Sequence, residues 1–117
     1  MNKFQFSKLF ALANIAVNNS YGFTVDAQTL EPITKGYAVA LVDTQNSFGI
    51  SGLAKVVEYI NNNKRVNAVG GWLDTESNKY YFDATVVLDD LADAIELGKS
   101  NGQIAIFDLN KKEEIRL

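Results

Sequence analysis

The sequence predicts an α+β domain in which helices pack against a mainly antiparallel sheet. Three segments have the apolar spacing of amphipathic helices, and strand-forming segments come in pairs between them. Paired strands between helices favour this class over a doubly wound parallel sheet. The expected order is helix, strand, strand, helix, strand, strand, helix and strand, with an optional last strand. The length of 117 residues, 47% of them hydrophobic, fits a single domain over residues 1–117.

The first predicted helix covers residues 6–17. Apolar residues recur there at the i, i+3, i+4 and i+7 spacing of a helix that buries one face on a sheet. They are Phe6, Leu9, Phe10, Ala13, Ala16 and Val17. We expect Asn2 or Ser7 to cap the start of this helix, and the polar run 18–22 to end it.

Two strands are expected next, at residues 23–25 and 35–42, joined by a loop that holds the only proline, Pro32. With the first helix they form a helix–hairpin unit, and residues 50–88 repeat its architecture. The strand at 35–42 is apolar on both faces, so we expect it in the centre of the sheet.

The loop at residues 43–49 is the most polar stretch and holds Phe48 as a candidate exposed aromatic residue. Loops of this kind carry function more often than core elements do. Free backbone N–H groups at residues 47–52 would suit a phosphate at the start of the following helix. No Walker-type lysine follows this run, so a plain helix cap by Ser47 or Ser51 is the favoured interpretation.

The second predicted helix covers residues 50–62. Its apolar stripe has helical spacing and consists of Ile50, Leu53, Val56, Val57 and Ile60.

The strongest strand signal is the stretch 69–88, where two runs of good strand formers enclose a polar turn at 74–78. This predicted β-hairpin carries the only tryptophan, Trp72, and the adjacent tyrosines Tyr80 and Tyr81. Successive side chains alternate between the faces of a strand, so the register of the turn decides which tyrosine accompanies Trp72. The sequence leaves that register open.

Two adjacent glycines, Gly70 and Gly71, precede the tryptophan. A strand tolerates such a loss of side chains where it bulges or where another group approaches its backbone. The favoured interpretation is a bulge that turns Trp72 into the core, and a ligand or partner surface is the alternative.

Asp89 and Asp90 start the third predicted helix, because carboxylates suit the positive N-terminal end of a helix. Its inward stripe is Leu91, Ala94, Ile95 and Gly98. The acidic residues here do not have the spacing of an EF-hand loop, so no metal site is predicted. A strand at 103–109 follows, and residues 114–117 are the optional edge strand.

Composition excludes several classes of function. The 11 Lys and Arg residues against 14 Asp and Glu give a net charge of -3, without the basic excess that binding to a nucleic-acid backbone requires. With no Cys and no His, the chain has no thiolate nucleophile, imidazole base or usual zinc ligand set. We therefore expect no enzyme activity and no cofactor. A secretory leader and a membrane span are not recognisable, which predicts a cytoplasmic protein.

Six phrases of the sequence are similar to those of a loose group of small accessory proteins of bacterial phages and conjugative elements. They lie within residues 22–109 and are Gly22-Phe23-Thr24-Val25, Thr29-Leu30-Glu31-Pro32, Thr44-Gln45-Asn46-Ser47-Phe48-Gly49, Val69-Gly70-Gly71-Trp72-Leu73, Lys79-Tyr80-Tyr81-Phe82-Asp83 and Ala105-Ile106-Phe107-Asp108-Leu109. The resemblance implies an accessory gene of a mobile element. In that setting small acidic domains often inhibit host defence, as anti-CRISPR and anti-restriction proteins do, and this step is an analogy.

Two hypotheses of different class follow. The favoured one is a non-catalytic binding protein that contacts a host or phage protein through exposed aromatic and polar side chains. Its predicted binding residues are Trp72, Tyr80, Tyr81, Gln45, Asn46 and Phe48. The alternative is a small-ligand or nucleotide-binding domain, or a minimal enzyme with Asp43, Asp74 or Asp83 as acid–base groups. An exposed edge strand can pair with a second copy, so a homodimer stays open.

Overall fold

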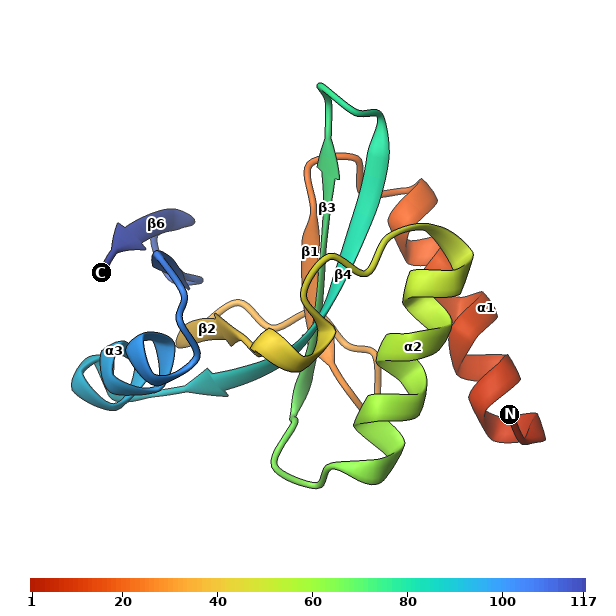
Figure 1. Cartoon of the computed structure of the whole chain (residues 1–117), viewed down its shortest axis with the longest axis horizontal. Helices are drawn as coiled ribbons and strands as arrows, with labels where there is room; N and C mark the ends of the chain where they lie inside the picture. Colours follow the sequence, from red (N-terminus) through yellow and green to blue (C-terminus); the bar gives the residue numbers. More distant parts are fainter.

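The computed structural model describes residues 1–117 and contains three α-helices and one six-stranded sheet (Figure 1). The elements are α1 (Lys3–Val17), β1 (Phe23–Asp26), β2 (Tyr37–Ala40), the short 3₁₀ helix η1 (Val42–Thr44), α2 (Gly49–Asn62), β3 (Ala68–Asp74), β4 (Lys79–Leu88), α3 (Leu91–Ser100), β5 (Ala105–Asp108) and β6 (Glu113–Arg116). The strand order is β1-β3-β4-β2-β5-β6, and every neighbouring pair is antiparallel. The predicted α+β class and element order are confirmed, and the optional last strand is present.

β3 and β4 form the predicted hairpin, whose tip projects at the top of Figure 1. Each residue of β3 has one partner in β4, so the ladder runs without a bulge. The predicted bulge that turns Trp72 into the core is therefore wrong, and Trp72 exposes 47% of its surface. Gly71 is needed for another reason. A Cβ atom on Gly71 would lie 2.3 Å from Cε1 of Phe23 and 2.9 Å from Cε1 of Tyr80, so aromatic rings fill the space above this backbone.

β1 and β2 do not pair with each other, so the predicted first hairpin is wrong. β1 pairs with β3, and β2 pairs with β4 and β5. The two strands flank the central hairpin on opposite sides, and the segment 27–36 between them is long enough to cross it. By pairing with the longer strands β3 and β4, β1 and β2 each gain a full ladder of cross-strand contacts. The predicted interior position of β2 is confirmed.

The main core lies between the hairpin and α2, with α1 packed outside α2 (Figure 1). Its fully buried residues include Leu53, Val56 and Val57 from α2. The hairpin contributes Val69, Phe82, Ala84 and Val86 from one face. The predicted stripe of α2 is confirmed except for Ile50, which lies in the first turn and is exposed.

The start of α1 is capped as predicted by Asn2, whose side chain accepts a hydrogen bond from the N–H of Gln5 (2.9 Å). The predicted buried stripe is only partly correct. Leu9 and Ala16 are buried together with Leu12, whereas Phe6, Phe10 and Val17 are exposed. Apolar residues occupy neighbouring arcs of this helix, and periodicity alone does not show which arc faces the core.

The C-terminal elements form a smaller cluster around Val39, Ala94 and Ile106. Asp90 caps α3 as predicted by accepting from the N–H of Asp93 (3.0 Å). The predicted inward residue Leu91 is exposed. β6 lies at the edge of the sheet, as expected. No helix in the structure has both the length and the apolar character to cross a membrane.

Candidate functional site

Three aromatic side chains form a continuous row on the hairpin side of the molecule. Trp72 stacks on Tyr81, its cross-strand partner, with ring centroids 5.0 Å apart and planes at 16°. Phe48 meets the other side of Tyr81 edge-on, with centroids 5.6 Å apart. Both arrangements are favourable for aromatic pairs. We call Phe48, Tyr81 and Trp72 the aromatic row.

The aromatic row faces away from the main core. Side chains alternate along a strand, and Phe82 next to Tyr81 is buried in the cluster with α2. Tyr81 and its partner Trp72 therefore lie on the opposite face of the hairpin. Trp72 and Phe48 remain 47% and 41% exposed. Exposed large aromatic rings gathered in one place are typical of an interaction surface.

The loop before α2 holds Phe48 in the row by running along the free edge of β4. The N–H of Ala84 donates to Oγ1 of buried Thr44 (2.9 Å), and the N–H of Phe82 donates to the carbonyl of Ser47 (2.8 Å). A single antiparallel bridge then links Phe48 with Tyr81. The loop thus replaces a neighbouring strand where β2 has ended.

The structure brings three of the six predicted binding residues together, namely Trp72, Tyr81 and Phe48. Tyr80 lies on the other face, where it packs on Phe23 and Phe82 and donates its hydroxyl to the carbonyl of Asn19 (2.7 Å). It is a packing residue. Gln45 and Asn46 are exposed in the loop. Asn46 lines a cavity next to the row, and Gln45 does not.

Lys79 belongs to the site but was not predicted from the sequence. Its Nζ lies 4.3 Å from the ring centroid of Phe48, a cation–π distance. Nothing in the sequence links these two positions, because the contact depends on the loop lying against β4. Lys79 gives the end of the row a positive charge.

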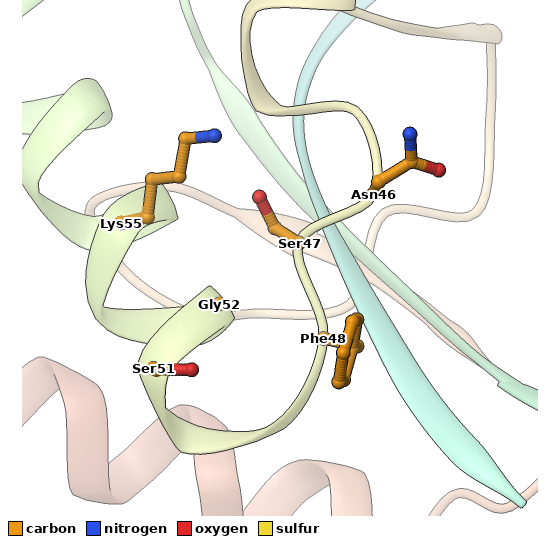
Figure 2. Close-up of a pocket in the computed structure, with 6 residues that line it drawn as sticks. All are labelled: Asn46, Ser47, Phe48, Ser51, Gly52 and Lys55. Atoms are coloured by element: carbon orange, nitrogen blue, oxygen red, sulfur yellow. The ribbon is translucent and has the colours of Figure 1, made fainter.

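A cavity of about 200 Å³ lies between the loop and the start of α2 (Figure 2). Its lining residues are Asn46, Ser47, Phe48, Ser51, Gly52 and Lys55. The predicted helix cap by Ser47 or Ser51 is wrong, because the N-cap residue is Phe48 and no side chain caps the helix. Ser47 folds back over the first turn, and its carbonyl carbon would lie 2.5 Å from a Cβ on Gly52. Ser47 thus lies one residue before the N-cap, and its Oγ has no hydrogen-bond partner.

The three carboxylates considered for acid–base work have separate environments. Asp43 accepts a hydrogen bond from the hydroxyl of Tyr59 (2.9 Å), and Asp74 accepts one from the hydroxyl of Ser77 (2.8 Å) in the hairpin turn. Asp83 lies on β4 opposite Gly70, where burial raises its pKa to about 6. No group of three or more acidic side chains could hold a metal ion. The three residues do not form one catalytic group.

The fold and the site together define a small α+β domain with a solvent-facing aromatic row and an adjoining polar cavity. Comparison with protein-family models, with curated protein sequences and with solved structures finds no match to the chain. The resemblance to proteins of phages and conjugative elements therefore stays a prediction from the sequence.

Proposed function

We propose that the protein is a non-catalytic binding module that docks another protein on the aromatic row. The observation that carries this proposal is the stacking of Trp72 on Tyr81, with Phe48 beside them, where Trp72 and Phe48 stay 47% and 41% exposed. The rings are held by one another and by the loop, so binding would order few side chains. Rigid aromatic anchors of this kind supply much of the affinity of protein interfaces.

The charges around the row favour a partner with acidic residues next to its apolar contact. Lys79 lies over Phe48, and Lys55 lines the adjoining cavity. Neither lysine pairs with a carboxylate, since the one salt bridge of the structure joins Arg116 and Glu114. Both ammonium groups are therefore available to a partner's carboxylates at the rim of the contact.

The resemblance of residues 22–109 to accessory proteins of phages and conjugative elements supports a more specific role. In that role the partner is a bacterial host protein, such as a CRISPR or restriction component, and the site of action is the host cytoplasm. Binding inhibits or modulates the partner. The lack of Cys and His supports binding over turnover, since the usual nucleophiles and bases are missing.

A pull-down from bacterial lysate with matched variants tests the proposal. Trp72→Ala removes the exposed end of the row, and Phe10→Ala removes a ring of α1 that is 66% exposed and outside the row. We expect wild type and Phe10→Ala to retain the same stoichiometric partner. Trp72→Ala should lose it, because truncating an aromatic anchor residue costs about 2 kcal/mol or more of binding energy.

Circular dichroism of both variants shows whether they keep the fold. A partner that the folded Trp72→Ala variant retains as well as wild type does would contradict docking on the aromatic row. The absence of any stoichiometric partner would also count against it.

A further inference from the structure

We propose that the cavity between the loop and the start of α2 binds a phosphate group. Four of its lining side chains can donate hydrogen bonds: the Ser47 and Ser51 hydroxyls, the Asn46 amide and the Lys55 ammonium group. In Figure 2 the Ser47 hydroxyl and the Lys55 ammonium group point toward one another across the cavity. The Asn46 amide points away from these two groups in Figure 2, so the Ser47 hydroxyl and the Lys55 ammonium group are the donors that face one space. One donor from the loop and a charged one from the helix suit an oxyanion placed between them.

Ser47 provides the observation that points to a ligand. Only 4% of this residue is exposed, and its Oγ is the one buried side-chain polar atom without a hydrogen-bond partner. A buried hydroxyl without a partner costs about 1–3 kcal/mol. Native structures satisfy nearly all such groups, so an acceptor in the cavity would restore the missing hydrogen bond.

The start of α2 adds a second favourable feature. This helix of 14 residues has no side-chain cap and no acidic residue in its first turn. Its first backbone N–H groups and its dipole therefore present partial positive charge at the end where the loop enters. Anions bind at such helix starts when side chains complete the site.

The charge and size of the cavity agree with a phosphate. Lys55 is the only charged residue of the lining and follows Ser51 by one helical turn, so both side chains lie on the same side of α2. None of the 14 acidic residues of the chain lines the cavity. The volume of about 200 Å³ leaves room for a group larger than one water molecule.

Titration with inorganic phosphate, followed by amide NMR spectra, tests the site. We expect saturable shifts of the Ser47, Ser51 and Gly52 amide signals that sodium chloride and sodium acetate at equal ionic strength do not produce. Lys55→Met keeps the length of the side chain and removes its charge, and should weaken binding about tenfold or more. Lys111→Met, in the turn before β6, is the matched control and should bind phosphate as wild type does.

Ser47→Ala separates a ligand site from a structural role. If the hydroxyl serves a ligand, the variant should lose the phosphate response without losing stability, because it removes an unpaired buried group. Non-saturable shifts, an equal response to acetate, or an unchanged response in Lys55→Met would overturn the proposal.

Titrations with O-phosphoserine and adenosine monophosphate distinguish the sources of the phosphate group. Tighter binding of the nucleotide, with shifts at Phe48 and Tyr81, would indicate a base stacked beside the cavity. Tighter binding of phosphoserine would indicate a phosphorylated side chain. Trp72→Ala should leave the response to inorganic phosphate unchanged, so failure of the protein-docking proposal and failure of this one are distinguishable.

Discussion

Gly71 is the residue on which the packing of the hairpin against β1 depends. The rings of Phe23 and Tyr80 cover its backbone and stack with centroids 6.2 Å apart, so neither can move aside freely. We expect Gly71→Ala to lower the free energy of unfolding by about 1–3 kcal/mol, the usual cost of overpacking. Gly70→Ala is the control, since its Cβ would come no closer than 3.1 Å to any atom, Oγ1 of Thr85, and would lie 3.9 Å from Oδ2 of Asp83. Urea denaturation that gives equal stabilities for both variants would refute this account.

Asp83 should make the stability of the protein depend on pH. Burial raises the pKa of its carboxyl from 3.8 to about 6 in the folded state. The folded protein therefore binds this proton more tightly than the unfolded chain does. The stabilisation is complete below pH 3.8 and is lost as the pH rises through about 6.

Asp83→Asn removes the charge and keeps the shape of the side chain. At neutral pH it should raise the free energy of unfolding, by on the order of 3 kcal/mol if the whole pKa difference is recovered. The difference between variant and wild type should shrink below pH 6. Urea denaturation above and below that pH measures this difference in the free energy of unfolding. A stability gain in Asp83→Asn that is independent of pH would contradict the burial of a charged carboxylate.

The register of Trp72 shows the limit of prediction at the scale of one residue. The sequence identifies Trp72, Tyr81 and Phe48 as candidates from their types and their positions near polar loops. It could not select Tyr81 over Tyr80, because a slip of one residue moves every side chain to the other face. The turn fixes the choice, with Asp74 paired to Lys79 and Asn78 in the left-handed region (φ 58°).

At the scale of elements, the loop before α2 depends on Thr44. This side chain is fully buried, and its Oγ1 accepts the hydrogen bond that the Ala84 N–H would otherwise give to a neighbouring strand. In Thr44→Val the new side chain has the same shape but leaves that N–H without an acceptor. We expect this to lower the free energy of unfolding by about 1–3 kcal/mol. Thr44→Ser keeps the oxygen and should be less destabilised. Thermal unfolding of the two variants measures the difference, and a Val variant as stable as the Ser variant would disprove this role.

α1 and β1 show why some element-level predictions fail. The helix was predicted correctly, but its buried arc was not, because Phe6 and Phe10 neighbour the arc of Leu9 and Leu12 that faces the core. The predicted pairing of β1 with β2 was wrong for a different reason. Two strand-forming segments close in sequence suggest a hairpin, yet β1 and β2 find longer partners in β3 and β4. Both outcomes are decided by tertiary contacts that periodicity does not contain.

At the scale of the whole molecule, the fold has two hydrophobic clusters of unequal size. The main cluster contains 15 buried residues, whereas the cluster around Val39, Ala94 and Ile106 contains three. Two residue pairs of β2, Tyr37↔Asp108 and Ala38↔Phe107, join β5 to the rest of the sheet. We expect amides of β5 and β6 to exchange with solvent hydrogen well before those of β3 and β4. Uniform protection across the sheet in a hydrogen-exchange experiment would refute this division.

The function of the whole molecule depends on whether a partner covers the aromatic row. Fluorine NMR of protein labelled with fluorotryptophan tests this most directly, because Trp72 is the only tryptophan and gives a single resonance. On titration with the partner captured by the wild type, we expect this resonance to shift and to lose its sensitivity to solvent isotope as Trp72 becomes buried. A resonance that keeps its position and its solvent sensitivity in the saturated complex would contradict docking on the aromatic row.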